Sequence, residues 1–343
     1  MKRTTVGIDL AKNSFQICQV NQAGKLVSNR PVKRAKFVEA IVQLPRSRIA
    51  MESCAGAHHW GRTISRLGHE VVLVPPQHVK PFVRGGKSDP RDALAIIEAA
   101  NRPALHAVPI KSLDQQDLQT LHRIRQLQVQ HATAIANQIR GIAHEYGICF
   151  ERGIHSLLRD LRFALEDAEN DLTETARLTL AYRYVDVLML REQVKRSRQR
   201  IVDRARELPA MARLLEAPTF GELVASSFLA SIGDGQQFKR GRQVSAWLGL
   251  VPRQHGTGGT MRLQGITKSG DRYLRTMLLH GSRAVIVRAR GKDTPIGRWV
   301  TPLIERRGHN KAVVALANKM ARIGWHIVAR GAHYDPAKAF GSS

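Results

Sequence analysis

Acidic residues are scarce in this sequence. It contains 28 Asp and Glu against 54 Lys and Arg, which gives a formal net charge of +26. Such an excess predicts strong, salt-dependent attraction to a polyanion such as nucleic acid. Because acids are so few, carboxylates that gather where strands and helices end need a chemical explanation.

Cysteine and long apolar runs are scarce as well. The three cysteines, Cys18, Cys54 and Cys149, are widely spaced, with no Cys-x-x-Cys pair and no histidine at zinc spacing, so neither a disulfide framework nor a structural zinc is indicated. No uninterrupted apolar run approaches the ~18 residues of a membrane-spanning helix. The N-terminus enters a strand pattern instead of a signal peptide. We therefore expect a cytoplasmic protein without a membrane partner.

Length and composition predict a globular chain of more than one domain. A length prior for 343 residues allows about two to three domains, and 43% hydrophobic residues are enough to build cores. We expect an α/β domain over residues 1–104, a helical region over 105–208, a mainly α C-terminal domain over 209–335 and a tail over 336–343.

The first hundred residues alternate between strand and helix patterns. Strands are predicted over residues 4–9, 14–20 and 25–32, over RIAMES and over EVVLVP. Helices are predicted near Phe37 to Leu44, around His59 to Leu67 and from Asp89 onwards. The resulting order β-β-β-α-β-α-β-α is the layout of an RNase H-like domain, in which the first and fourth strands lie side by side.

Four carboxylates lie at the ends of these elements: Asp9 in GIDLAKN, Glu52 in IAMES, and Asp89 and Asp92 in KSDPRDA. In the predicted order Asp9 and Glu52 end adjacent strands, while Asp89 and Asp92 are three apart and share one helix face. Mg²⁺ is bound by one or two carboxylates together with water and substrate phosphate. Two such ions flanking a phosphate form a nuclease or strand-transfer site. We therefore predict a catalytic metal site at this edge.

Each acid also has a structural interpretation. Asp-Pro-x-Asp is a good helix start, with Asp89 as N-cap, Pro90 at the first helical position and Asp92 facing the positive end of the helix dipole. Asp9 and Glu52 follow apolar runs and are ordinary strand-end residues in this interpretation. For a single acid the structural interpretation is favoured, and only the common edge of the predicted sheet favours metal binding.

From about residue 105 to 208 the pattern is helical, with apolar residues at steps of three to four. We interpret this region as an insertion of long helices, a hairpin or short coiled coil that invites self-association. Its last turns, VKRSRQRIVDRARE, are strongly basic. Arg196 and Arg200 are predicted nucleic-acid contacts, and a solvated helix face is the alternative.

Outside the acids, candidate binding and catalytic residues are densest in a glycine-rich segment, VPRQHGTGGTMRLQGITKSGDRYLR. Its glycines permit close approach of the backbone to a ligand. Predicted phosphate donors are Arg253, Arg262, Lys268, Arg272 and Arg275. The hydroxyls of Thr257 and Thr260 lie in the loop; a loop threonine is usually polar filler, and as a nucleophile it needs a cation or base to activate it.

GIDLAKN, the glutamate of AMES, KSDPRDA and the segment from SIGDGQQFKRGRQVSAWLGLVPRQHGTGG to ITKSGDRYLR resemble the DEDD transposases of bacterial insertion sequences. These are the bridge-RNA-guided recombinases, related to Piv-type invertases. The resemblance covers nearly the whole chain. It implies an N-terminal RuvC-like domain of the RNase H class, a coiled-coil insertion and a C-terminal transposase domain.

The resemblance also implies roles for particular residues. Asp9, Glu52, Asp89 and Asp92 match the four metal-binding acids of the family. Thr257 matches the loop hydroxyl that forms a covalent link to DNA, where family members commonly carry serine. Threonine is bulkier and stiffer at χ1, and Thr260 is the second candidate for the nucleophile.

We therefore expect a Mg²⁺-dependent DNA recombinase that moves its own insertion element, associated with the bacterial nucleoid. An element-encoded guide RNA would pair with donor and target DNA, as in other RNA-guided systems. The enzyme is expected to be a homo-oligomer whose site combines acids of one protomer with the hydroxyl of another. The alternatives are a RuvC-like nuclease or junction resolvase without a covalent intermediate, and a non-enzymatic nucleic-acid-binding protein.

Overall fold

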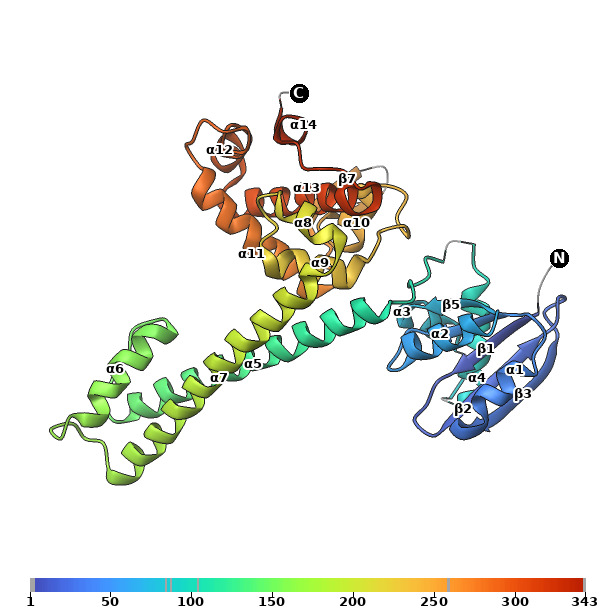
Figure 1. The fold of residues 1–343 in the computed structure, drawn as a ribbon, viewed down its shortest axis with the longest axis horizontal. Helices are drawn as coiled ribbons and strands as arrows, with labels where there is room; N and C mark the ends of the chain where they lie inside the picture. Colours follow the sequence, from blue (N-terminus) through green and yellow to red (C-terminus); the bar gives the residue numbers. More distant parts are fainter. Residues whose placement is uncertain (1–3, 84, 87, 104, 258–259, 342–343) are drawn as a thin grey trace. The chain divides into compact units, whose positions relative to one another are not determined.

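The computed structural model describes residues 4–83, 85–86, 88–103, 105–257 and 260–341. Two compact units make up the chain, Met1–Ser112 and Leu113–Ser343. The first holds a five-stranded sheet with helices, and the second is helical apart from one hairpin (Figure 1). Within the described residues no helix combines the length and apolar character that crossing a membrane requires. The division into the domains predicted from the sequence stays a prediction.

The sheet of the first unit has the strand order β3-β2-β1-β4-β5. β1 is antiparallel to β2 and parallel to β4, which confirms that the first and fourth strands are neighbours. This mixed sheet is compatible with the predicted RNase H-like domain. The strands are β1 (Thr5–Asp9), β2 (Ser14–Val20), β3 (Leu26–Lys33), β4 (Arg48–Glu52) and β5 (Glu70–Val74).

The two faces of this sheet are covered by different helices, because successive side chains in a strand point to opposite faces. Val6 and Ile8 of β1 belong to a core with α1 (Phe37–Val42) and α2 (Ala57–Arg66). On the other face lies α4 (Asp89–Ala100), which packs on β1, β2 and β4. Short turns, η1 (Arg34–Lys36), α3 (Pro76–Val79) and η2 (Lys80–Phe82), complete the unit.

Two long helices, α5 and α7, lie alongside each other in the second unit (Figure 1). Each has 33 residues and is therefore about 50 Å long. The coiled-coil description stays a prediction. The helices of this unit are α5 (Leu113–Glu145), α6 (Ile154–Glu166), α7 (Glu174–Arg206), α8 (Pro209–Leu215), α9 (Glu222–Ile232), α10 (Gly241–Trp247), α11 (Arg272–Ala289), α12 (Pro295–Arg307), α13 (His309–Arg330) and α14 (Pro336–Phe340).

The core of the second unit surrounds α9, which packs against α5, α7, α8 and α11. Phe220 and Phe228 meet edge to face with ring centroids 5.2 Å apart. A Cβ at Gly324 of α13 would lie 2.5 Å from the Phe220 ring, so only glycine lets the helix pack this closely. Residues of α5 and α7 belong to this core, together with residues of the helices that follow the glycine-rich segment.

A buried polar network joins three helices of this core. His122 of α5 has its Nε2 atom 3.0 Å from Ser226 Oγ of α9 and its Nδ1 atom 2.9 Å from the Tyr273 hydroxyl of α11. Burial, and then the charge of Arg125, lower the pKa of His122 to about 4, so the ring is neutral at pH 7. The network fixes α5 to α11.

Candidate active site

The predicted acids lie on the sheet face covered by α4. Asp9 is the last residue of β1 and Glu52 is the last residue of β4. They follow Gly7 and Ala50 by two residues, and both of those face α4. Asp89 and Asp92 lie in the first turn of that helix. The alternation of the strands and the helix spacing therefore direct all four residues toward one edge.

Three of the four acids form a close group. The carboxylates of Asp9, Asp89 and Asp92 each offer an oxygen within 4.8 Å of the other two. Glu52 lies outside this group, although it is near enough for the charge of Asp92 to affect it. The structure thus brings Asp9, Asp89 and Asp92 together and leaves Glu52 at their border.

The start of α4 differs from the sequence prediction. Asp89 was predicted to be the N-cap, but the N-cap is Ser88 and Asp89 is the first helical residue. No side-chain capping bond is present at this end of the helix. The capping interpretation of Asp89 is therefore wrong, because the helix begins one residue earlier than the Asp-Pro pattern indicated. Both aspartates remain near the positive end of the helix dipole, which stabilises negative charge.

Electrostatic effects at this edge follow from burial and from like charges. Burial raises the pKa of Glu52, and the neighbouring charge of Asp92 raises it further. Burial also raises the pKa of the Cys54 thiol, with further contributions from Glu52 and Asp9. Glu52, Asp9 and Asp92 thus belong to one negative field, and a cation among them would relieve their mutual repulsion.

This donor set fits a hard divalent cation. Carboxylate oxygens are the ligands that Mg²⁺ prefers, and it is bound by few of them with water and phosphate completing the shell. Asp89 is exposed, while Asp9 and Asp92 are half-buried, so the group is open to a substrate phosphate. Asp9, Asp89 and Asp92 are therefore the residues that would hold the metal, with Glu52 beside them.

The backbone of β1 positions the acids through Gly7. A Cβ at this residue would lie 2.3 Å from the Ala93 carbonyl oxygen and 2.5 Å from Ile97 Cγ1, both on α4. Only glycine permits this approach of strand and helix. The close packing brings the first turn of α4 to the end of β1, where Asp9 lies.

Two side-chain amides, those of Asn29 and Gln16, connect the start of α4 to the sheet. Asn29 of β3 donates from Nδ2 to the Pro90 carbonyl oxygen at 2.9 Å. The Gln16 side chain donates from Nε2 to Asn29 Oδ1 at 2.6 Å. Gln16 is also the residue paired with Asp9 across β1 and β2. Hydrogen bonds thus link the helix turn that carries Asp89 to Gln16, which lies beside Asp9 in the sheet.

A Gly7→Ala variant tests this positioning. We expect the free energy of unfolding to fall by about 3 kcal/mol, because the new methyl group overlaps α4. Any DNA cleavage should fall more than the unfolded fraction explains, since α4 must move away from Asp9. The measurements are thermal unfolding and strand cleavage below the melting temperature.

The matched control for this variant is Gly141→Ala in α5, where a Cβ meets nothing within 4 Å. Alanine there should be neutral or stabilising, because it is the better helix former. Wild-type melting and cleavage in Gly7→Ala would contradict the role given to Gly7.

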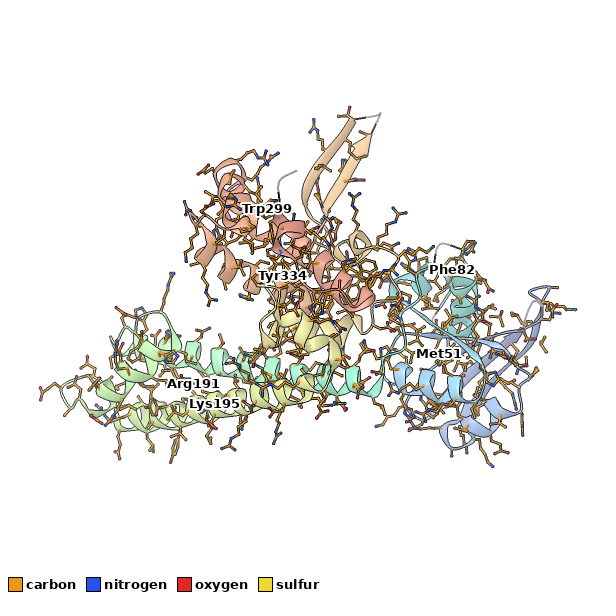
Figure 2. All side chains as sticks on the ribbon, turned by 45° about the horizontal axis from the view of Figure 1, so that its top comes forward. Met51, Phe82, Arg191, Lys195, Trp299 and Tyr334 are labelled. Atoms are coloured by element: carbon orange, nitrogen blue, oxygen red, sulfur yellow. The ribbon has the colours of Figure 1, made fainter. Side chains whose placement is uncertain are left out.

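Thr257 lies in the second unit, at the end of an exposed hairpin. The strands β6 (Pro252–Thr257) and β7 (Thr260–Ile266) form a separate two-stranded sheet, in which Thr257 pairs with Thr260. Every residue of β6 is exposed, and the hairpin stands out from the helices of its unit (Figure 2). The Thr257 hydroxyl is therefore presented at the tip. Gly258 and Gly259, which belong to the predicted loop, lie outside the described residues.

The base of the hairpin is held by close backbone packing. A Cβ at Gly270 would lie 1.9 Å from the Trp247 carbonyl oxygen, and one at Gly249 would lie 2.3 Å from Ser269 N. Arg275 donates from Nη1 to the carbonyl oxygens of Leu248 at 2.9 Å and Ser269 at 2.6 Å. The segments that enter and leave the hairpin are thereby joined.

Arg275 therefore has a different role from the predicted one. Its side chain is buried, 7% exposed, and its guanidinium bonds to the backbone. It is therefore not placed to meet a phosphate at the surface. The other predicted donors of this segment are exposed: Arg253, Arg262, Lys268 and Arg272.

The basic end of α7 is partly neutralised by its own neighbours. Arg196 forms an ion pair with Glu192 at 3.1 Å on the same helix face. Arg204 contacts Asp114, Asp117 and Glu207. Arg196 and Arg200 are nevertheless exposed, and the side chains of Arg191 and Lys195 lie on the same helix (Figure 2). Nucleic-acid contact through Arg196 and Arg200 stays a prediction.

A group of carboxylates at the end of β1 and the start of α4, on a mixed sheet in a strongly basic chain, is the arrangement expected of an enzyme that acts on nucleic-acid phosphodiesters. Sequence relatives give the particular family. Residues 211–295 match the Transposase IS116/IS110/IS902 family, and residues 6–148 match the DEDD transposase family of IS110 type. The chain belongs to the IS110/IS116 family of insertion-sequence transposases, and it is a DNA transposase.

Relatives match along almost the whole chain. A probable family 20 transposase of Pseudomonas aeruginosa is 42% identical over 337 residues, covering 98% of this chain and 100% of the relative. The transposase for insertion sequence element IS1111A of Coxiella burnetii is 40% identical over 329 residues, covering 96% of this chain and 90% of the relative. A pilin gene-inverting protein of Moraxella bovis is 29% identical over 133 residues, covering 38% and 40% respectively.

Proposed function

We propose that this transposase cuts and rejoins the DNA of its own insertion element with metal-bound acids and a loop hydroxyl. The observation that supports this most strongly is the grouping of Asp9, Asp89 and Asp92 within 4.8 Å on the sheet edge. Family membership gives the DNA substrate and the reaction class. The chemistry of the carboxylates favours Mg²⁺.

In this proposal the acids would hold the cation against which the scissile phosphate is oriented. A divalent cation bound by Asp9, Asp89 and Asp92, with Glu52 beside them, would polarise the phosphate and offset its charge. Asn29 and Gly7 keep α4 at the strand ends, so the carboxylates stay grouped without reorganisation. Preorganised charge of this kind contributes strongly to catalysis.

Thr257 is the proposed nucleophile. A bond forms from its Oγ1 to phosphorus as the bond to the leaving sugar oxygen breaks, and the proton lost by Thr257 balances the one gained by the leaving oxygen. The exposed tip of the hairpin allows a DNA strand to reach this hydroxyl. Reversal of the step by another strand's sugar hydroxyl then joins new DNA ends.

Partners of the reaction follow from the same proposal. Donor and target DNA would be paired with an element-encoded guide RNA, which the basic surface binds through its phosphates. We also propose a homo-oligomer associated with the nucleoid. Exposed apolar residues that share one face of α7 support self-association: Leu178, Tyr182, Val185 and Met189. Sedimentation equilibrium that shows only a monomer at all concentrations would contradict the oligomer.

Metal removal tests the proposed function in the purified full chain. With guide RNA and DNA that carries the joined element ends, added Mg²⁺ should give both broken and rejoined strands. A chelator should abolish both products, and excess Mg²⁺ should restore them, because the carboxylates alone cannot neutralise the phosphate. Equal product formation in chelator and in Mg²⁺ would contradict the metal-dependent site.

A further inference from the structure

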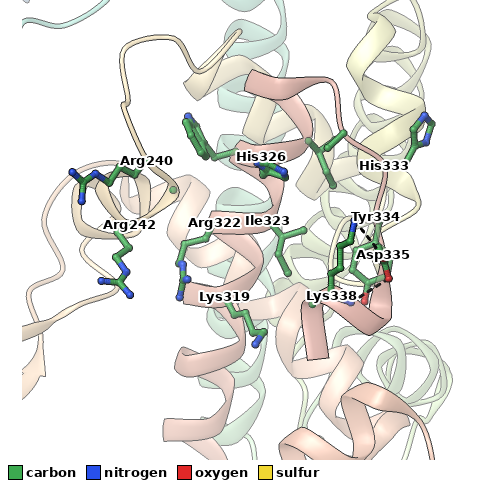
Figure 3. Close-up of a pocket in the computed structure, with 15 residues that line it drawn as sticks. Arg240, Arg242, Lys319, Arg322, Ile323, His326, His333, Tyr334, Asp335 and Lys338 are labelled. Carbon is green, nitrogen blue, oxygen red and sulfur yellow. Dashed lines mark hydrogen bonds and ion pairs between the residues drawn. The ribbon is translucent and has the colours of Figure 1, made fainter. Parts of the chain in front are cut away.

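A cavity of about 830 Å³ lies in the second unit, and its lining residues come from outside the hairpin that carries Thr257 (Figure 3). Three segments line it: the start of α10, one face of α13 and the chain from Ala332 into α14. All three belong to one compact unit. The volume is in the range of sites that bind small molecules or a few linked residues of a polymer.

The lining is strongly basic. Five cationic side chains contribute to it: Arg240, Arg242, Lys319, Arg322 and Lys338. Among the described residues that line the cavity, Asp335 is the only acid, and it is the N-cap of α14, accepting from Ala337 N at 2.9 Å and Lys338 N at 3.2 Å. Across the residues that the structure describes, no ion pair joins Arg240, Arg242, Lys319 or Arg322 to a carboxylate.

The Lys319 ammonium lies close to aromatic rings and to a second positive charge. Its Nζ atom lies 5.1 Å from the Trp299 ring centroid and 4.9 Å from that of Phe340. Burial lowers the pKa of Lys319, and the charge of Arg322 lowers it further. Aromatic faces stabilise the ammonium but do not neutralise it. A bound anion would supply the missing negative charge.

The walls of the cavity are fixed before any ligand binds. A Cβ at Gly241 would lie 3.1 Å from Arg322 Cα, so α10 and α13 are in close contact. Trp325 donates from Nε1 to the Gly235 carbonyl oxygen at 2.9 Å. Glu216 accepts from Tyr334 N at 3.1 Å and also contacts His333, which secures the chain after α13. A preformed site binds without a large ordering cost.

We infer that this cavity binds the phosphodiester backbone of a nucleic-acid strand. Lys319, Arg322 and His326 recur at three- and four-residue steps on one face of α13, over about 10 Å, so they form a row of nitrogen donors along the cavity. Arg240 and Arg242 line the same cavity from α10. The inference rests on the proposed function for the source of the strand and assigns an anchoring site apart from the acids and the hairpin.

Binding by an Arg240→Ala/Arg322→Ala double variant tests the inference. Alanine at position 322 keeps the Cβ that contacts Gly241. The matched control is Arg306→Ala/Arg307→Ala, which removes the same charge from the exposed end of α12. Fluorescence anisotropy with short single strands of DNA and of RNA of one sequence, measured with the full chain in chelator over a series of salt concentrations, gives the affinity and its salt slope.

The cavity variant should bind roughly 10- to 100-fold more weakly than wild type. The slope of log affinity against log salt should fall in magnitude by about 1.4, because two phosphate contacts are lost. Loss for DNA, for RNA or for both supports the inference and identifies the strand. Affinity and slope equal to those of the control for both probes would overturn it. The chelator prevents cleavage, so a failure of the transposition chemistry leaves this result unchanged.

Discussion

Replacement of Asp92 by asparagine is expected to lower the rate of DNA strand cleavage by about 10³-fold or more, while the first unit stays folded. Asp92 belongs to the group with Asp9 and Asp89, and its charge helps to raise the pKa of Glu52. Loss of a metal-binding carboxylate removes several kcal/mol of charge stabilisation, and each 1.36 kcal/mol is about tenfold in rate. Single-turnover cleavage of element DNA measures the effect.

Glu98→Gln provides the control for this variant. Glu98 is half-buried, lies on the same helix six residues after Asp92, and is outside the acid group. Its replacement removes the same charge without removing a metal-binding oxygen, so cleavage should stay within about twofold of wild type. Full cleavage by Asp92→Asn, or equal losses in both variants, would show that the acids do not form the site.

Thr257→Ala is expected to abolish the covalent link between protein and DNA and to reduce strand exchange by about 10³-fold or more, because the variant has no hydroxyl to attack phosphorus. Thr257→Ser should keep the link, since the primary hydroxyl of serine is less hindered. Denaturing gels of reactions stopped with detergent reveal the link as DNA that migrates with the protein.

Thr260→Ala is the matched control for the nucleophile. The two threonines pair across the hairpin, are both exposed and lose the same atoms on substitution. The link should persist in Thr260→Ala. A link that vanishes in Thr260→Ala and persists in Thr257→Ala would transfer the role of nucleophile to Thr260.

The alternation of β1 and β4 made the acid edge predictable from sequence. A strand directs residues two apart to one face, so Gly7 with Asp9 and Ala50 with Glu52 had to share a side of the sheet. The order of elements predicted that the first and fourth strands are neighbours, and the pairing of β1 with β4 confirms it. The face on which a strand residue lies can be predicted because the alternation of side chains depends only on the local backbone, not on distant contacts.

Contacts between distant segments could not be predicted in the same way. Arg275 has the composition of a phosphate donor, but the carbonyl oxygens of Leu248 and Ser269 bind its guanidinium. On α5, Ile124 and Leu127 have helical spacing and are nevertheless 47% and 52% exposed. Their positions depend on which face α7 and α9 cover, and spacing alone does not determine that face.

The basic cavity shows the same limit for binding sites. Arg240 and Arg242 are close in sequence. Lys319 and Arg322 lie much further along the chain, on α13, and Lys338 lies beyond that helix. The run FKRGR, which contains Arg240 and Arg242, is basic, but nothing in it shows that it lies beside α13. Gly241 lets α10 pack closely on α13 at the wall of this cavity.

The most direct test of the central claim is identification of the residue that becomes linked to DNA. A reaction with Mg²⁺ is stopped, the DNA is digested to a single nucleotide, and the protein is cut into peptides for mass spectrometry. The account predicts a nucleotide phosphate on Thr257, absent in Asp92→Asn and in chelator. Cleaved DNA with no nucleotide on any peptide would contradict it and identify a nuclease that hydrolyses DNA without a covalent intermediate.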